Sequence, residues 1–449
     1  MNYKLFILFI YNIFNINNMC FNCSALYISC VNNNIKRIKN LIKNGANINK
    51  CEYGNNLPLI IAYEKNNIKC FKNLIKNGAD VNKCINSGYS SLFIVCKEGN
   101  IEWLKILIEN GANVNKCCND YTSPLFIACQ ENHIECVKIL IENRVNVNKC
   151  NNNGESPLFI VCQEDNFECL KILIKNGADI NKCNIYYFSP LYVACKNNNI
   201  ECVKILIKNG ADIHKCNIYD CTPLYISCEN NNIECVKILI ENNVDINKCR
   251  YCGYTPLYIV CKNNHFKCLK ILIEKGADIN KCNNKGSSPL YVACKKNNIE
   301  CVKILIKNGE DINKCNNNGI SPLYIACKKN NIECVKILIK NGAYINKYDN
   351  EHCTPLYIAC KKNNFKCLKI LIENGADINK CNIYEFSPLY ISCKNNNIEC
   401  INILFKSNIN IYLKNKHNKT AFYISHEKYF NHIILKFLQN GINIKYELQ

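Results

Sequence analysis

The residues best equipped for chemistry in this sequence are its cysteines. The chain has 37 cysteines in 449 residues, a content that usually indicates a secreted scaffold held together by disulfides. Thirty-one of them recur with a spacing of 33 residues and form three columns, from Cys30 to Cys393, from Cys70 to Cys400 and from Cys51 to Cys381. Reduced, such thiols can also act as redox-reactive groups or as zinc ligands.

The spacing of the columns argues against disulfides. A disulfide needs Cα atoms within about 7 Å of each other, whereas packed helices lie about 10 Å apart. Cysteines of one column, carried by successive stacked segments, are therefore too far apart to be linked. We expect reduced thiols, with the first two columns at apolar helix positions, where cysteine behaves as a small hydrophobic residue.

The third column has two interpretations. It falls on a connecting arm, where we expect the thiols to be partly exposed. One interpretation is a row of reactive thiols, whose pKa nearby lysines would lower, in a redox or metal-buffering protein. The other is that duplication of the segments copied these cysteines without a role.

Metal sites and catalytic sites have no complete pattern in the sequence. The pairs Cys20/Cys23 and Cys249/Cys252 each match half of a zinc site, and neither has a second pair nearby. The seven histidines fall in different columns, and no glycine-rich phosphate loop is present. The sequence therefore predicts a protein that is not an enzyme, with no catalytic residues, no metal, no cofactor and no small-molecule substrate.

The elements that must position these side chains follow the same period. All ten prolines, from Pro58 to Pro388, occupy one column, and the segments run in phase from about residue 13 without insertion or deletion. A fixed period of this length is typical of a solenoid, in which each repeat buries its apolar face against its neighbours. We therefore expect one elongated array rather than several globular domains.

The segment 184–216 illustrates how one repeat is built. Ser189 and Pro190 predict the start of a first helix with one apolar face. An Asn-rich turn follows, and then a second helix over about 200–209, which Gly210 ends in left-handed conformation. Arg144, Asn243 and Asn408 replace this glycine in three repeats, and of these we expect Arg144 to be strained.

The residues of this segment identify a family resemblance. Ser-Pro-Leu-Tyr-Val-Ala at 189–194 and Glu-Cys-Val-Lys-Ile-Leu-Ile-Lys-Asn-Gly-Ala-Asp-Ile at 201–213 resemble the ankyrin repeat, whose signature opens Thr-Pro-Leu-His-x-Ala. Two departures recur: Tyr or Phe replaces the histidine in nearly every repeat, and Asn replaces the glycine of the interhelical turn except at Gly99. The resemblance covers almost the whole chain.

The resemblance implies an all-α solenoid of about 13 repeats of 33 residues, with short β-hairpin tips. It also implies that protein partners bind to the concave surface formed by the tips and the first helices. We expect a column of first-helix tyrosines to line that surface half-buried: Tyr192, Tyr225, Tyr258, Tyr291, Tyr324, Tyr357 and Tyr390.

The array is expected to span residues 21–407, with residues 408–449 as a degenerate capping repeat. Residues 1–20 have two interpretations. They form either a half-repeat that caps the N-terminal end of the stack or a signal segment, because residues 5–14 are apolar. A run of that length is too short to span a membrane.

The tip, between the third cysteine column and the first helix, is the least uniform part of each repeat. Aromatic residues there are candidate anchors for a partner; the alternative is packing on neighbouring tips. The candidates are Tyr121, Tyr186, Tyr187, Phe188, Tyr219, Tyr251, Tyr254, Tyr384 and Phe386.

A lysine recurs beside the tips in eleven successive repeats, and this column is called the lysine edge. It could steer an acidic partner; the alternative is a solvated face. The candidates are Lys149, Lys182, Lys215, Lys248 and Lys281.

The net charge of +20 permits attraction to acidic proteins, nucleic acid or anionic lipid without choosing among them. We predict a monomeric, cytoplasmic scaffold or adaptor that binds a protein partner, with nucleic acid and membranes not expected as partners. The alternative function is binding of nucleic acid or an anionic surface through the lysine edge. The alternative location is outside the cell, if residues 1–20 are a signal peptide.

Overall fold

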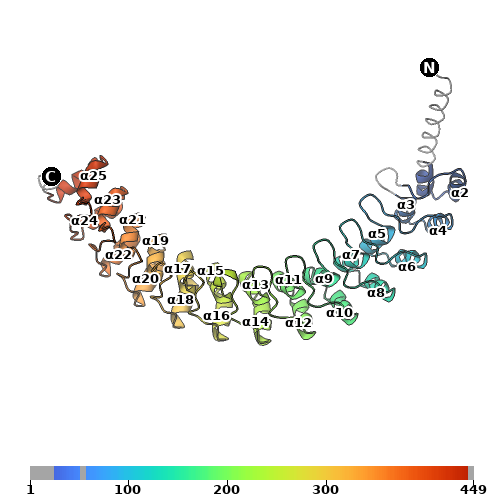
Figure 1. Ribbon diagram of the computed structural model, residues 1–449, viewed down its shortest axis with the longest axis horizontal. Helices are drawn as coiled ribbons and strands as arrows, with labels where there is room; N and C mark the ends of the chain where they lie inside the picture. The colour runs from blue at the N-terminus through green and yellow to red at the C-terminus, as the bar shows by residue number, and fades with distance from the viewer. Residues whose placement is uncertain (1–24, 51–56, 443–449) are drawn as a thin grey trace, which may run out of the picture. The chain divides into compact units, whose positions relative to one another are not determined.

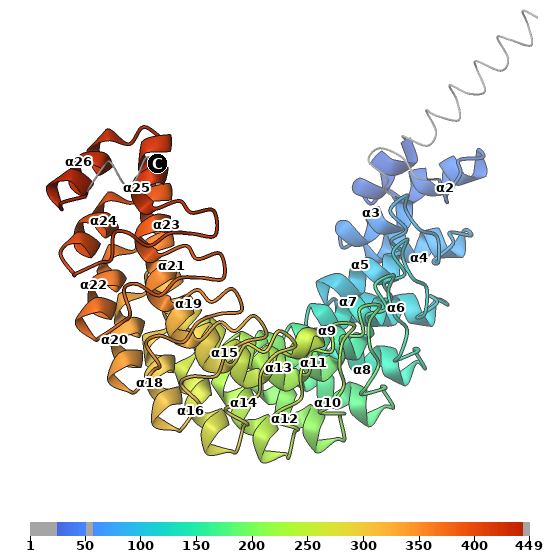
Figure 2. The same ribbon diagram turned by 60° about the vertical axis from the view of Figure 1, so that its left-hand side comes forward.

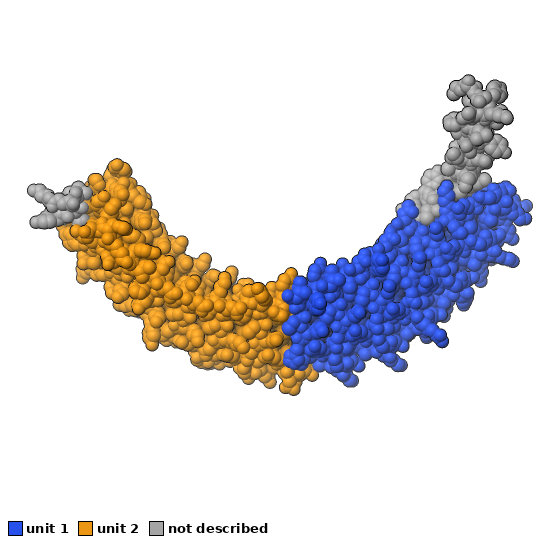
Figure 3. All heavy atoms as spheres, in the orientation of Figure 1, with its two compact units in different colours: residues 1–218 blue, residues 219–449 orange. Residues whose placement is uncertain are grey.

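The computed structural model describes residues 25–50 and 57–442. These residues form pairs of short helices joined by turns (Figure 1). The chain divides into two compact units, residues 1–218 and residues 219–449, called unit 1 and unit 2 (Figure 3). Within each unit the first helices of the pairs form an inner row and the second helices an outer row (Figure 2).

The helices of unit 1 alternate in length along the chain. A helix over residues 25–31 precedes α2. The other first helices are α3 (Pro58–Glu64), α5 (Ser91–Glu98), α7 (Pro124–Gln130), α9 (Pro157–Gln163) and α11 (Pro190–Asn197). The second helices are α2 (Ile35–Lys43), α4 (Ile68–Lys76), α6 (Ile101–Glu109), α8 (Ile134–Glu142), α10 (Phe167–Lys175) and α12 (Ile200–Lys208).

Unit 2 continues the same alternation. Its first helices are α13 (Pro223–Glu229), α15 (Pro256–Asn263), α17 (Pro289–Lys296), α19 (Pro322–Lys329), α21 (Pro355–Lys361), α23 (Pro388–Lys394) and α25 (Ala421–Glu427). Its second helices are α14 (Ile233–Glu241), α16 (Phe266–Glu274), α18 (Ile299–Lys307), α20 (Ile332–Lys340), α22 (Phe365–Glu373), α24 (Ile398–Phe405) and α26 (Asn431–Gln439). A short 3-10 helix, η1 (Tyr251–Gly253), lies in one tip.

The helix boundaries follow from the capping residues. The hydroxyl of Ser189 accepts a hydrogen bond from the Tyr192 amide at 3.1 Å, and Pro190 is the first helical residue of α11. After α12, Gly210 takes a φ of 85°. Arg144 replaces this glycine with a φ of 60°, in the left-handed region where a side chain is strained. These features of the repeat were predicted correctly.

The core lies between the two rows of helices. In the repeat of α11 and α12, the residues Leu191, Cys195, Cys202, Val203 and Leu206 are 0–1% exposed. The core is apolar, and cysteine contributes to it as a small hydrophobic side chain. Both helical cysteine columns are buried throughout the described residues, as predicted.

The first-helix tyrosines correct one expectation. The seven rings expected to be half-buried, from Tyr192 to Tyr390, are only 1–7% exposed. Part of the cover comes from the tip of the same repeat, since the ring of Phe188 stacks on that of Tyr192 at 4.8 Å. These tyrosines are therefore core residues rather than a lining of the inner face.

The tips form less β-pairing than the expected β-hairpins. Among the described residues, β-pairing is limited to two isolated bridges, Cys84 with Ser90 and Arg250 with Tyr254. Elsewhere an asparagine closes the turn: Asn184 Oδ1 accepts hydrogen bonds from the amides of Tyr186 and Phe188, each at 3.0 Å. The side chain takes the place of a second pair of backbone hydrogen bonds, so the tip needs no ladder.

Asparagine also joins successive repeats. Asn148 Oδ1 accepts a hydrogen bond from the Asp179 amide at 2.8 Å, and its Nδ2 donates to the Gly177 carbonyl at 3.2 Å. The first of these bonds recurs in other repeats, from Asn49 to Asn379. We call this contact the asparagine clamp. The clamp therefore gives the asparagine that recurs at this position of the repeat a structural role.

Candidate functional site

The tip aromatics divide into two groups. Six of them have side chains at least half exposed, namely Tyr121, Tyr186, Tyr187, Tyr219, Tyr251 and Tyr384. Large apolar surface in water is unfavourable unless something covers it. These six residues therefore form the candidate contact set within the two units.

The remaining three tip aromatics pack on their own repeat. Phe188, Tyr254 and Phe386 each stack on the first-helix tyrosine four residues later, with ring centroids 4.7–4.8 Å apart. They are half-buried, and the structure assigns them a packing contact. In the sequence, this arrangement is indicated by two aromatic residues four positions apart, one in the tip and one in the first turn of the following helix.

Two of the exposed tyrosines have unusual backbones. Tyr121 and Tyr187 have φ values of 64° and 60°, in the left-handed region where bulky side chains are rare. Other repeats place glycine at this position, including Gly88 and Gly154. The chain therefore places two large aromatic residues at positions whose left-handed backbone conformation favours glycine.

Neighbouring tips are joined through their backbones. In unit 1 the Ile185 amide donates to the Asn153 carbonyl at 3.0 Å, and the Ile218 amide donates to the Tyr186 carbonyl at 3.4 Å. In unit 2 the Tyr251 amide donates to the Tyr219 carbonyl at 3.3 Å. The tyrosines thus project from a braced rim rather than from free loops, which lowers the entropy lost on binding.

The lysine edge lies beside the tips. Lys182, Lys248 and Lys281 are exposed, and Lys149 and Lys215 are half-buried. Lys149 Nζ lies 5.9 Å from the ring centroid of Tyr121, which brings one candidate lysine against one candidate tyrosine.

Arg250 supplies a further tip cation that periodicity did not reveal. Its guanidinium lies 5.7 Å from the Tyr219 ring and 5.8 Å from the Tyr225 ring. Most repeats have asparagine at this position. The replacement of that asparagine by arginine is the feature of the sequence that could have identified Arg250 as a candidate.

A second row of lysines lies at the C-terminal ends of first helices in unit 2, and we call it the lysine face. The lysine face lies at a different position of the repeat from the lysine edge. In a single repeat, its lysines look like ordinary solvent-exposed residues at a helix end, so the sequence of one repeat does not identify them as a binding surface. Its members are Lys262, Lys295, Lys296, Lys328, Lys329, Lys361, Lys362 and Lys394.

The first and second cysteine columns meet between neighbouring repeats. Burial and a hydrogen bond from its thiol to Cys202 raise the pKa of Cys162 well above its ordinary value. Cys261 and Cys301 form the same pair in unit 2. The two cysteines of each pair are 40 positions apart in the sequence. Each column has a spacing of 33 residues, so neither column by itself predicts this pairing.

The third cysteine column is half-buried in the described residues, as predicted, while Cys51 lies outside them. Burial raises the pKa of Cys150, and the lysines Lys182 and Lys149 oppose this only in part. Cys183 and Cys315 show the same balance. At these three thiols the lowering of the pKa by lysine, which the interpretation as reactive thiols requires, is outweighed by desolvation.

The potential metal ligands of residues 25–50 and 57–442 are dispersed. No group of three or more His, Cys, Asp or Glu side chains in this part of the chain could hold a metal ion. Cys249 is half-buried and Cys252 is exposed, while Cys20 and Cys23 lie outside the described residues. In the same part of the chain, no helix is long and apolar enough to cross a membrane.

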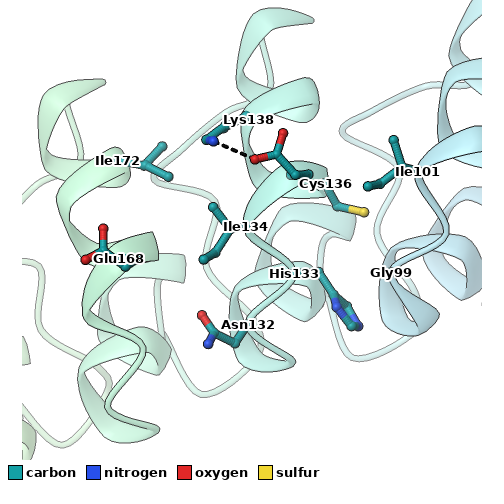
Figure 4. A pocket seen from close by; sticks show the side chains of 10 residues that line it. Gly99, Ile101, Asn132, His133, Ile134, Cys136, Lys138, Glu168 and Ile172 are labelled. Atoms are coloured by element: carbon teal, nitrogen blue, oxygen red, sulfur yellow. Dashed lines mark hydrogen bonds and ion pairs between the residues drawn. The ribbon is translucent and has the colours of Figure 1, made fainter.

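A hollow of about 650 Å³ lies on the outer row beside α6, α8 and α10 (Figure 4). Lys138 pairs with Glu135 there, and His133 Nε2 lies 3.0 Å from the Lys97 carbonyl oxygen. A Cβ atom at Gly99 would collide with the His133 ring, so this turn has room for glycine alone. Within the hollow, Lys138 and Glu135 are therefore engaged with each other.

Comparison with known families decides the identity of the repeats. Residues 2–84, 92–184, 181–250, 245–316 and 290–382 match the model for ankyrin repeats in three copies. The chain belongs to the ankyrin-repeat family. Ankyrin repeats are generally protein-interaction modules, and their fold is typically non-enzymatic.

Among solved structures, this ankyrin-repeat chain is similar to the human ASB11 ankyrin repeat domain. The two are 29% identical, and the match covers 50% of this chain and 99% of the other with a TM-score of 0.46. No curated protein sequence matches the chain.

Proposed function

We propose that this protein is a non-enzymatic scaffold or adaptor that binds a protein partner along the inner face of its ankyrin repeats. The observation that carries the proposal is the set of six tip tyrosines that are at least half exposed on a braced rim. Tyrosine gives a large contact area at low entropic cost and is enriched among residues that dominate binding energy. The lysine edge would steer an acidic partner toward this rim.

The proposed compartment is the cytoplasm. The described cysteines are free thiols, and so many free thiols persist best in a reducing environment. The proposed active form is a monomer without cofactor, in which residues 408–449 serve as the terminal cap. The segment 1–20, on which the alternative of secretion depends, lies outside the described residues.

The test exchanges two exposed tyrosines in unit 1. A variant with Tyr186→Ser and Tyr187→Asn removes both rings, and asparagine tolerates the left-handed backbone at position 187. Partners captured from the native host are first identified by mass spectrometry, and their affinity for each variant is then measured by titration. We expect the double variant to bind at least about tenfold more weakly, since each aromatic anchor contributes on the order of 1 kcal/mol or more.

A matched control is available at Tyr344. Its side chain is 65% exposed, and it lies on the arm after α20 rather than on a tip. Tyr344→Ser should retain the partner with unchanged affinity. Equal binding by the native protein and the Tyr186/Tyr187 variant would reject these tyrosines as anchors.

A further inference from the structure

The charge at the ends of the first helices varies from repeat to repeat. In unit 1 the helices α7 and α9 end in Gln130-Glu131 and Gln163-Glu164. The same positions in α17, α19 and α21 hold Lys295-Lys296, Lys328-Lys329 and Lys361-Lys362. Among the described first helices, pairs of adjacent lysines at these two positions occur in α17, α19 and α21, whereas α5 and α11 carry a single lysine there, Lys97 and Lys196, and α13 ends in Glu229-Asn230. A general bias toward lysine would act on all repeats alike, so it does not account for the clustering in these three helices.

The lysine face is concentrated around Lys295. Burial and the charges of Lys329, Lys296, Lys285 and Lys328 together lower the pKa of this amine. Several like charges held this close create a strong local positive potential. By contrast, outer-row lysines such as Lys303 pair with a glutamate one turn earlier, here Glu300 at 2.8 Å.

A hollow of about 460 Å³ borders the lysine face between first helices and tips. Three of its lining lysines belong to the face, and the half-buried Ile320 gives it apolar surface. The lining includes Tyr324, Lys328, Lys361, Lys362, Ile320 and Ile358. Positive charge beside apolar surface fits a ligand that carries both carboxylates and apolar side chains.

We propose that the lysine face binds an acidic segment of a protein partner, in which closely spaced Asp or Glu side chains alternate with apolar residues. This inference rests on the proposed function, because it states the chemistry of one part of the partner. The carboxylates contact the lysines at the helix ends, and the apolar side chains enter the hollow between α19 and α21.

The surroundings favour a polypeptide over nucleic acid. Single-stranded nucleic acid is held by stacking of bases on aromatic rings, but Tyr291 and Tyr324 are only 7% and 4% exposed. Asp349 and Glu351 also line the hollow beside Lys328 and Lys361. They would repel a continuous phosphate chain, whereas a peptide can place neutral side chains opposite them.

The test uses the full-length protein and a fluorescein-labelled dodecapeptide of glutamate and leucine. A peptide with glutamine in place of glutamate and a single-stranded oligonucleotide of equal charge serve as comparison probes. We expect the variant K295Q/K296Q/K328Q/K329Q to bind the glutamate peptide roughly tenfold or more weakly. Fluorescence anisotropy at physiological salt gives the dissociation constants.

The matched control removes the same charge elsewhere in unit 2. Lys267, Lys270, Lys366 and Lys369 are exposed on the outer-row helices α16 and α22. Their joint change to glutamine should alter peptide binding by no more than about twofold, because distant charges are screened.

Several results would overturn the inference. Equal loss in both lysine variants would mean that only net charge matters, and equal binding of the glutamine peptide would mean that carboxylates are not recognised. Tighter binding of the oligonucleotide than of the peptide would make the face a nucleic-acid site. The Tyr186/Tyr187 variant should bind the peptide normally, so failure of either proposal leaves the other standing.

Discussion

The thiol of Cys367 donates a hydrogen bond to Asn330 Oδ1 at 3.4 Å and receives one from the thiol of Cys327. The same chain of three residues recurs one repeat earlier with Cys294, Cys334 and Asn297. Cysteine is suited to this place because it is small and apolar yet still carries a weak donor and acceptor. The periodicity predicted its burial, but the thiol pairs depend on the stacking register between repeats, which periodicity does not define.

Glu310 is an unusual buried carboxyl group in unit 2. It stands where most repeats have alanine, is 5% exposed, and accepts a hydrogen bond from the Leu290 amide at 2.8 Å through Oε1. Its other oxygen, Oε2, has no hydrogen-bond partner. Burial raises its pKa to about 8, although hydrogen bonds from Leu290 and Ser288 act in the opposite direction.

This raised pKa predicts a pH dependence of local stability. Between the unfolded pKa near 4.5 and the folded pKa of about 8, the folded state holds a proton that the unfolded state has lost. The contribution of Glu310 to stability is therefore largest at low pH and is lost as pH rises through 8. Glu310→Gln should remove this dependence and stabilise α17 and α18 above pH 8 by on the order of 3 kcal/mol.

Hydrogen exchange of the α17 and α18 amides at several pH values measures this effect. The native protein should lose protection relative to the Gln variant as pH rises from 5 to 9, on the order of a hundredfold in exchange rate. Parallel profiles for the two proteins would show that Glu310 ionises freely in the fold.

At the scale of the element, capping residues made most helix boundaries predictable. Ser189, Pro190 and Gly210 mark α11 and α12 in the sequence as they do in the structure. The tips were less predictable, because a single asparagine such as Asn184 replaces a ladder of backbone bonds. The exposure of the first-helix tyrosines was misjudged because it depends on side chains of the tip, as Phe188 shows.

The end of α8 offers a test of helix termination. Arg144 has a φ of 60° where most repeats have glycine, so Arg144→Gly should stabilise the protein by about 1 kcal/mol. A urea titration followed by circular dichroism would detect the shift to a higher midpoint.

The neighbouring residue provides the control for this change. Asn143 has a φ of −91°, and its Nδ2 donates to the Ile139 carbonyl at 2.8 Å. Asn143→Gly removes that bond without relieving strain and should lower the midpoint. A rise for both variants would indicate a general effect of glycine rather than relief at Arg144.

At the scale of the whole molecule, each repeat packs against its neighbours within its own unit. In unit 2, α17 packs against α19 and α18 against α20. Stability in such an array is close to a sum of repeat and interface contributions. Damage inside one repeat is therefore expected to remain local.

Cys301→Asp tests this locality. Cys301 is 0% exposed, and a buried charge without a partner should destabilise its repeat by about 3 kcal/mol or more. Hydrogen exchange should show lost protection in α17 to α20 and normal protection in α7 to α10. Cys301→Ser is the matched control, because its hydroxyl can still donate to Asn264 Oδ1, which the thiol contacts at 3.6 Å.

Two outcomes would contradict this expectation. Unchanged exchange in α18 would mean that position 301 accommodates a charge, and loss of protection in unit 1 as well would mean that the chain unfolds cooperatively throughout.

The asparagine clamp has a consequence for how such a gene can evolve. Asn148 binds backbone atoms of the following repeat, and almost every repeat offers the same atoms at the same offset. Unequal recombination that adds or removes one whole segment of 33 codons therefore leaves every remaining clamp with an acceptor and a donor. The array can therefore gain or lose complete repeats and still fold. Such a change alters the order of the surfaces that contact a partner, but it does not disrupt them.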